Sequence, residues 1–175
     1  MDKRESYGEK TARVRAAYRE ARGRFAARLR DADEQVVHRV PPDGGWSAAQ
    51  IGWHVAAVDT SFAAVISGEV PAAKPLADGT SARPWADIAA VLPDRLEAGK
   101  RVQPPAEVRR EDVLASLEES ARRLDAALAG LSEERAAAYA ITHPVLGTVA
   151  LGAVGEWAVA HVARHNAQAK RVLGS

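Results

Sequence analysis

Apolar side chains recur at intervals of three and four residues in four long stretches of this chain. This spacing places them on one face of an α-helix and predicts that the face is buried. The four predicted helices cover residues 5–34, the residues from Ser47 to just before Gly68, residues 111–130 and residues 150–172. Four long amphipathic helices predict an all-α four-helix bundle, with a long crossover between the second and third helices.

The start of the second predicted helix carries a clear local signal. Ser47 is a good N-cap residue, and Gln50 three positions later completes a capping box. His54 lies three residues after Ile51 and four before Val58, so the periodicity places its side chain on the inward face. The rest of the inward stripe consists of Val55, Phe62 and Ile66.

The segments between the long helices contain residues that interrupt helices. A long loop is expected from Gly68 to about Ser81, and a shorter helix over residues 84–100 that Pro93 kinks or divides. Gly130 is expected to cap the third long helix, with a short helical turn after it. Residues 141–149 are expected to form a turn-rich connection.

The composition fits one domain and restricts any metal site. At 175 residues, the chain is long enough to form one domain with a sizeable core, expected over residues 1–175. It contains no cysteine, so a metal would be bound by histidine, carboxylate, carbonyl or water. The N-terminal residues are charged, and no stretch approaches the roughly 18 apolar residues of a membrane span. A cytoplasmic protein with no membrane segment is expected.

Positive charge is concentrated near the N-terminus. Residues 1–30 hold ten Lys and Arg against four Asp and Glu, whereas the whole chain has a net charge of +1. A basic helix of this kind fits either a nucleic acid or acidic partner, or a solvated helix face. The lack of interleaved aromatic residues favours the solvated face, so no nucleic-acid partner is expected. Glycine-rich phosphate-binding motifs are also missing, which argues against a nucleotide cofactor.

Three histidines form the candidate functional site. His161 and His165 are four residues apart on the last predicted helix and therefore share one face. With His54 on the inward face of another helix, they predict a three-nitrogen metal site with open coordination positions, as in catalytic metal sites. The alternative is that the histidines are hydrogen-bonded residues of the core.

The ligand type indicates the class of metal. Neutral imidazole suits divalent transition metals, with zinc or nickel favoured here and iron as an alternative. Such a metal would lower the pKa of a bound water or thiol. The histidine spacing is that of a zinc-protease helix, but Val162 stands where that motif has its glutamate, so the metalloprotease interpretation fails.

Four further residues are weaker candidates, each with a structural alternative that is favoured. Gln50 could orient an imidazole, but the capping box accounts for it. Trp157 could wall a pocket, but core packing is commoner. His143 could face the open side of the metal, but an exposed loop histidine is commoner. His38 is expected only to complement the dipole of the first helix.

The order of these motifs resembles the DinB/YfiT-like superfamily of bacterial metal-binding bundles. The resemblance rests on Gly45-Trp46-Ser47 through His54, on His143-Pro144 through Glu156-Trp157 to His161, His165 and Gln168, and on Arg101 to Pro105. It implies an up-down-down-up bundle, often a homodimer, with a metal held by His54, His161 and His165 and water completing the shell. Some members are transferases or isomerases that use a low-molecular-weight thiol.

Three functions follow as expectations. The first is a metal-dependent enzyme acting on a small-molecule substrate, by thiol-dependent transfer or isomerisation or by hydrolysis, with Arg101 or Arg164 as candidates to bind a substrate carboxylate. The second is a non-catalytic, stress-related bundle that binds a metal or ligand. The third is a purely structural bundle. The enzyme is favoured, although fold resemblance alone does not define a reaction.

Overall fold

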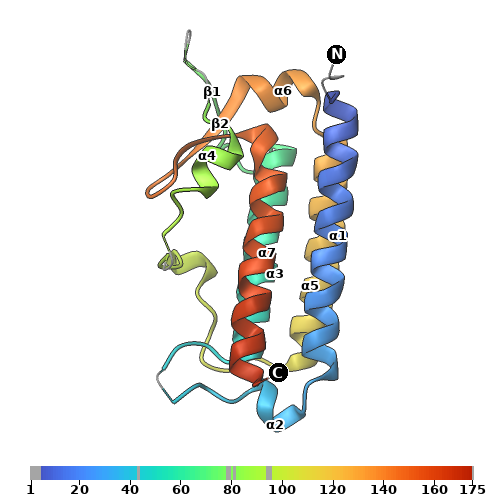
Figure 1. Ribbon diagram of the computed structural model, residues 1–175, viewed down its shortest axis with the longest axis vertical. Helices are drawn as coiled ribbons and strands as arrows, with labels where there is room; N and C mark the ends of the chain where they lie inside the picture. The colour runs from blue at the N-terminus through green and yellow to red at the C-terminus, as the bar shows by residue number, and fades with distance from the viewer. Residues whose placement is uncertain (1–4, 43, 78–79, 81, 94–95, 175) are drawn as a thin grey trace.

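The computed structural model describes residues 5–42, 44–77, 80, 82–93 and 96–174. Four long helices lie side by side along the longest axis of the molecule (Figure 1): α1 (Tyr7–Asp31), α3 (Ala48–Ser67), α5 (Arg110–Gly130) and α7 (Val154–Leu173). A small three-stranded antiparallel sheet lies near one end of them. The prediction of a mainly helical bundle is confirmed at this level, and the sheet is an addition to it.

Helix ends follow the expected capping chemistry. The Ser47 hydroxyl accepts a hydrogen bond from the Gln50 backbone N–H, and the Gln50 side chain accepts one from the Ser47 N–H, which confirms the predicted capping box. Ser6 and Glu9 form the same arrangement at the start of α1. Gly68 ends α3 in the left-handed region with φ 85°, a conformation that glycine adopts without a Cβ penalty.

The core lies along the facing stripes of the four long helices. The inner face of α1 is buried, and the predicted inward residues of α3 are buried except for the half-buried Val58. The buried residues of α1 include Val14, Tyr18, Ala21, Phe25 and Leu29. α3 packs most extensively against α5, and α1 packs against both α5 and α7. The largest fully buried side chains of this core include Tyr18, Phe25, Leu29, Ile51, Leu117 and Leu124.

Several predicted helix boundaries are wrong. The first helix ends at Asp31, and a separate turn α2 (Glu34–Val37) begins after Asp33, whose carboxylate accepts hydrogen bonds from the Gln35 and Val36 N–H groups. Gly130 lies within the last turn of α5, and Leu131 in extended conformation is the cap.

The helix predicted over residues 84–100 is much shorter in the structure. α4 (Trp85–Ala89) precedes Pro93, and a short 3-10 helix, η1 (Lys100–Val102), follows further along the chain. Proline removes a backbone donor and disfavours helical conformation in the residue before it, so the apolar pattern cannot extend a helix through this point. Residues 94 and 95 of this prediction, and 78, 79 and 81 of the predicted loop, lie outside the described residues.

The segment predicted as a turn-rich connection is a β-hairpin. Strand β2 (Tyr139–His143) pairs antiparallel with β3 (Gly147–Ala150), and its other edge pairs with β1 (Lys74–Pro75). α6 (Glu133–Ala138) leads into the hairpin, and the 3-10 helix η2 (Leu151–Ala153) leads out of it, so the last helix begins at Val154 rather than at residue 150. The left-handed φ of 72° at Gly147 permits the tight turn.

Several cations of the basic N-terminal helix pair with carboxylates of this chain. Lys10 forms an ion pair with Glu156 of α7, and Arg15 forms a bidentate pair with Asp125 of α5. Within the described part of the chain, no helix is both long and apolar enough to cross a membrane.

Replacing Gly52 with valine should destabilise the bundle by about 1–3 kcal/mol, because it overpacks a full core. A Cβ at this position would stand 2.6 Å from Leu29 Cδ1 and 2.7 Å from Val113 Cγ1, so α3 could not keep its distance from α1 and α5. Urea unfolding would measure the loss. The matched control is Gly23→Ala, where nothing lies within 4 Å of the new Cβ and a gain of about 0.5–1 kcal/mol is expected. Equal stability of Gly52→Val and the wild type would contradict this packing argument.

Candidate metal centre

The bundle brings the three predicted histidines together between α3 and α7. One ring nitrogen from each of His54, His161 and His165 lies within 4.8 Å of the other two. The Nε2 atoms of His54 and His161 are 3.1 Å apart, and the His161 and His165 ring centroids are 4.4 Å apart. Among the described residues, no other group of three or more histidine, aspartate or glutamate side chains brings its ligand atoms this close together.

A backbone carbonyl fixes the tautomer of His54. Its Nδ1 lies 2.7 Å from the carbonyl oxygen of Val102 in η1, and a carbonyl can only accept a hydrogen bond. Nδ1 therefore carries the proton, and Nε2 keeps a lone pair directed at the other histidines. The Trp46 ring, 4.9 Å from the imidazole, covers the buried His54. This is the ligand orientation that a metal-binding histidine requires.

His165 has a similar arrangement within its own helix. Its Nδ1 lies 2.8 Å from Oε1 of Gln168, so the ring donates there and directs Nε2 toward the cluster. His161 differs, because its buried Nδ1 has no hydrogen-bond partner. Two of the three imidazoles are thus oriented by oxygen acceptors, and the third has an unpaired nitrogen in the protein interior.

The surroundings keep all three imidazoles neutral. Burial lowers the pKa of His54, against the effect of its hydrogen bond to Val102. Burial, followed by the charges of His54 and Arg164, lowers the pKa of His165 to about 4. Burial lowers the pKa of His161 well below its ordinary value, and repulsion from the protonated forms of His165 and His54 and from Arg164 and Arg22 lowers it further. Neutral imidazole is the protonation state that binds a metal.

The spacing of the donor atoms fits a single ion. Zinc–nitrogen bonds are about 2.0–2.1 Å long, so two nitrogens on one ion can be at most about 4.2 Å apart. The 3.1 Å separation of the His54 and His161 Nε2 atoms is within that limit. Nitrogens within 4.8 Å of one another therefore need little adjustment to reach one ion. These residues could hold a divalent transition metal.

Without metal, the free energy of unfolding should fall as the pH is lowered from 7 to 5. Unfolded histidines take up protons near pH 6.5, whereas these three have lower pKa values in the folded protein, so acid favours the unfolded state. The stability they contribute is complete above pH 6.5 and is lost as the pH falls toward the folded values. Asp59 opposes this effect, because burial raises its folded pKa to about 6 from 3.8.

On unfolding at acid pH the three histidines take up protons and Asp59 releases one, a net uptake of about two protons. The free energy of unfolding should therefore fall by up to about 3 kcal/mol for each pH unit. Urea unfolding in the presence of a chelator at pH 7, 6 and 5 would measure it. The His165→Asn variant should give a shallower dependence, since one of the three groups is gone. A free energy of unfolding that stays constant or rises over this range would show that the histidines are not held neutral.

The other sequence candidates have structural roles. Gln50 completes the capping box, and its Nε2 donates to the carbonyl oxygens of Pro105 and Ala106 rather than to an imidazole. The His143 Nδ1 accepts hydrogen bonds from the Val145 and Leu146 N–H groups and so closes the hairpin turn.

The candidate aromatic and charged residues also have partners. Trp157 packs among the rings of Phe62, Trp85 and His143, which agrees with core packing. His38 caps α2, not α1, and contacts Glu34 at 3.1 Å. Arg164 donates to the carbonyl of Pro93, and Arg101 is exposed in η1.

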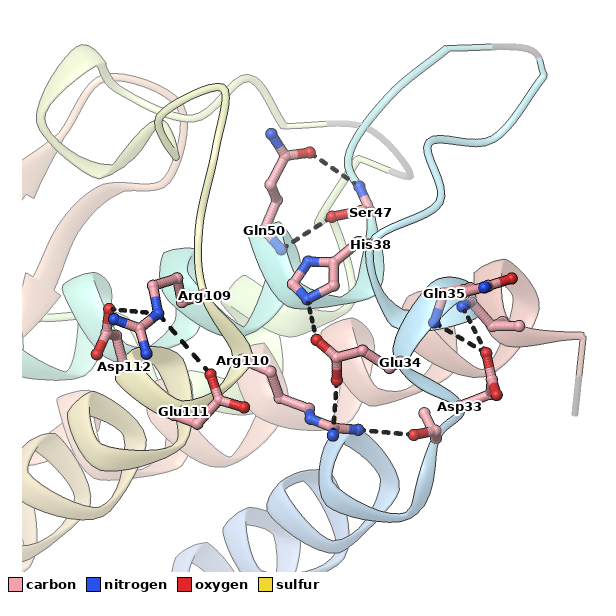
Figure 2. Close-up of polar contacts among 12 residues, drawn as sticks. Asp33, Glu34, Gln35, His38, Ser47, Gln50, Arg109, Arg110, Glu111 and Asp112 are labelled. Carbon is pink, nitrogen blue, oxygen red and sulfur yellow. Dashed lines mark hydrogen bonds and ion pairs between the residues drawn. The ribbon is translucent and has the colours of Figure 1, made fainter.

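A cavity of about 800 Å³ lies next to α2, α3 and the start of α5, and none of the three clustered histidines lines it. Its wall includes Gln50 and Trp53 of α3, together with residues around α2 and the start of α5. Figure 2 shows the charged side chains of this region pairing with one another, with Glu34 between His38 and Arg110, and Arg109 beside Glu111 and Asp112. The cavity is therefore separate from the histidine cluster.

A buried polar cluster that the sequence did not predict lies in the same bundle. Asp59 is fully buried, and its Oδ2 accepts a hydrogen bond from the Tyr18 hydroxyl at 2.7 Å and pairs with Nε of Arg22 at 2.9 Å. Arg22 also donates to the Leu117 carbonyl and to the Ser120 hydroxyl of α5. One signal could have indicated this cluster, because Asp59 is the single charged residue of the otherwise uncharged α3.

Comparison with known proteins identifies the family. Residues 17–169 match the DinB superfamily, a span that includes most of the chain and all three histidines. The chain therefore belongs to the DinB superfamily, and the resemblance inferred from its motifs is confirmed. No curated protein and no solved structure gives a match.

Proposed function

We propose that this protein is a divalent-metal-dependent enzyme that acts on a small molecule through a low-molecular-weight thiol. The observation that carries the proposal is the convergence of three neutral imidazoles, two of them oriented by fixed oxygen acceptors. Three protein ligands leave coordination positions for a substrate, which distinguishes catalytic from structural sites. Zinc or nickel is the favoured metal and iron the alternative, since all three accept imidazole.

A bound metal would supply Lewis acidity, lowering the pKa of a thiol or water that it binds. The surrounding residues favour the thiol. Hydrolysis usually needs a protein base near the metal, but the residue after His161 is Val162, which is fully buried in the core. No carboxylate joins the histidines in the described part of the chain. A thiol has a pKa near 8.5, so it needs far less assistance than water to lose its proton.

The protein itself would orient the ligands and limit access of water. The Val102 carbonyl and Gln168 keep two imidazoles directed at the site, while the indole of Trp46 covers His54. The half-buried His161 and His165 form the more accessible side of the cluster. A substrate would approach from that side, and its thiol would not need a proton acceptor from this chain.

One contact favours a competing, purely structural function. The Nε2 atoms of His54 and His161 are at hydrogen-bond distance, 3.1 Å, as expected if the histidines only satisfy one another in the core. A structural bundle predicts that a chelator leaves stability unchanged and that purified protein contains no metal. A non-catalytic metal-binding protein predicts bound metal without turnover.

A panel of thiol-transfer assays would test the enzyme. Zinc- and nickel-loaded protein should transfer glutathione, bacillithiol or mycothiol to an electrophilic acceptor at least 100-fold faster than protein treated with a chelator. The matched control is His143→Ala, which removes a histidine outside the cluster and should keep the activity. Metal bound at one equivalent without thiol transfer or hydrolysis of any substrate would favour the non-catalytic alternative.

The remaining features of the proposal rest on family resemblance. We propose that residues 1–175 form one domain, that the four long helices adopt the up-down-down-up order of the superfamily, and that the protein is a cytoplasmic homodimer. Analytical ultracentrifugation would test the dimer. No nucleic-acid partner is proposed, in line with the internal pairing of the α1 cations.

A further inference from the structure

Three buried polar atoms of the core have neither a hydrogen-bond partner nor an ion-pair partner. They are Nδ1 of His161, Oδ1 of Asp59 and Nη1 of Arg22. Leaving such groups unpaired costs about 1–3 kcal/mol each, so an unpaired donor and acceptor in the same region need an explanation. Among the described residues, Asp59 is also the only carboxylate buried in the core.

The helix packing places Asp59 and His161 at neighbouring levels. His54 contacts His161, and Phe62, two turns further along α3, contacts Trp157 with ring centroids 4.8 Å apart. Asp59 lies between those two levels on α3. Arg22 of α1 reaches the same level, since its Nε pairs with Asp59 at 2.9 Å.

Metal binding would define the role of the unpaired nitrogen. If His161 binds the metal through Nε2, which faces His54, its Nδ1 must carry the proton and needs an acceptor. The corresponding acceptors of His54 and His165 are the Val102 carbonyl and Gln168. His161 has no such partner, while Asp59 has a free acceptor atom.

We propose that Asp59 is a positioning residue of the metal centre, whose Oδ1 accepts the Nδ1–H of metal-bound His161, directly or through one water. Tyr18 and Arg22 hold the carboxylate in place through Oδ2, which leaves Oδ1 for the histidine. The proposal rests on the metal binding proposed above. It extends the ligand set to a cluster in α1 and α3 that does not itself touch the metal.

Zinc affinity, measured by competition with a chelator, tests the proposal. Asp59→Asn should weaken zinc binding about 10–100-fold, the usual effect of losing a residue that orients a ligand. Asp59→Asn also leaves the positive charge of Arg22 without its counter-charge. That charge alone would repel zinc, even if Asp59 made no hydrogen bond to His161. The double variant Arg22→Met/Asp59→Leu removes both charges, and it should remain about 10–100-fold weaker than the wild type because the acceptor is gone.

Asp125→Asn is the matched control. It breaks another aspartate–arginine pair of α1, at a position away from the histidines, and should bind zinc as the wild type does. Nitrogen-15 NMR of zinc-loaded wild type gives an independent readout: the His161 Nδ1–H signal should exchange slowly with water, and in the double variant it should exchange faster.

The outcomes separate the two proposals. Wild-type zinc affinity in the folded double variant, or binding of His161 through Nδ1, would overturn the role of Asp59 and leave the metal site intact. Absence of zinc and nickel binding in the wild type would overturn the metal site and the positioning role with it.

Discussion

The His161→Ala variant is expected to lose stoichiometric zinc binding. The His161 ring contacts both other ligands, with its centroid 5.1 Å from that of His54 and 4.4 Å from that of His165. Removing it leaves two imidazoles, and the affinity should fall more than about 100-fold, beyond the range seen when only an orienting partner is lost. Metal analysis of the purified protein and calorimetric titration with zinc would measure the change.

Thermal unfolding should show the same loss. A ligand at 1,000 times its dissociation constant stabilises the folded state by about 4 kcal/mol, which in a chain of this length raises Tm by about 10 °C. Wild-type protein should show that shift on adding zinc, and His161→Ala should show almost none. Circular dichroism of the metal-free variant would verify that it folds.

His143→Ala is the matched control for this prediction. His143 lies in the hairpin and contacts Trp157, outside the group of three, so its loss should leave the zinc stoichiometry unchanged. Equal zinc content in wild type and His161→Ala would exclude the three-histidine site. A loss of zinc in both histidine variants would instead indicate a site that includes the hairpin.

The parts of the site that the sequence predicts are those that helical periodicity determines. His161 and His165 share a face because they are four residues apart, and the capping box at Ser47 fixes the phase of α3 and so directs His54 inward. Side-chain spacing on a helix is a local property, so it can be derived from the residues themselves. The convergence of the two helices then follows from burying their apolar faces.

The parts that the sequence does not predict depend on contacts between distant segments. The Val102 carbonyl that orients His54 is a backbone group, and no side-chain pattern identifies it. The third strand of the sheet depends on β2 pairing with Lys74–Pro75, far away in the chain. The sequence does not single out Arg22 as the partner of Asp59, because Arg22 belongs to a helix rich in arginine. Its position four residues after Tyr18 does place both side chains on the same face of that helix.

The Asp59→Leu variant is expected to lose about 3–5 kcal/mol of folding free energy. The substitution leaves the guanidinium of Arg22, 4% exposed, without its counter-charge, and also removes the acceptor of the Tyr18 hydroxyl. Urea unfolding at pH 7.5 with a chelator would measure the loss without any contribution from bound metal. Asp125→Asn, which breaks a partly exposed pair with Arg15, should lose only about 0.2–1 kcal/mol.

Adding Arg22→Met to Asp59→Leu should restore part of that stability. Replacing a buried ion pair by apolar residues of similar volume is often neutral or stabilising, because the desolvation of both charges no longer opposes folding. The double variant should therefore be about 1–3 kcal/mol less stable than the wild type, because the buried Tyr18 hydroxyl still lacks its acceptor. A double variant as unstable as Asp59→Leu alone would show that the two charges are not energetically coupled.

Recovery of stability together with weak zinc binding would separate two contributions of the pair. It would show that folding does not require the buried charges, whereas the metal centre does. The free Oδ1 of Asp59 and the unpaired Nδ1 of His161 provide the physical reason, since an apolar pair fills the same space but offers no acceptor to the histidine. On this account, the charged pair in the core is a component of the histidine site and not of the packing around it.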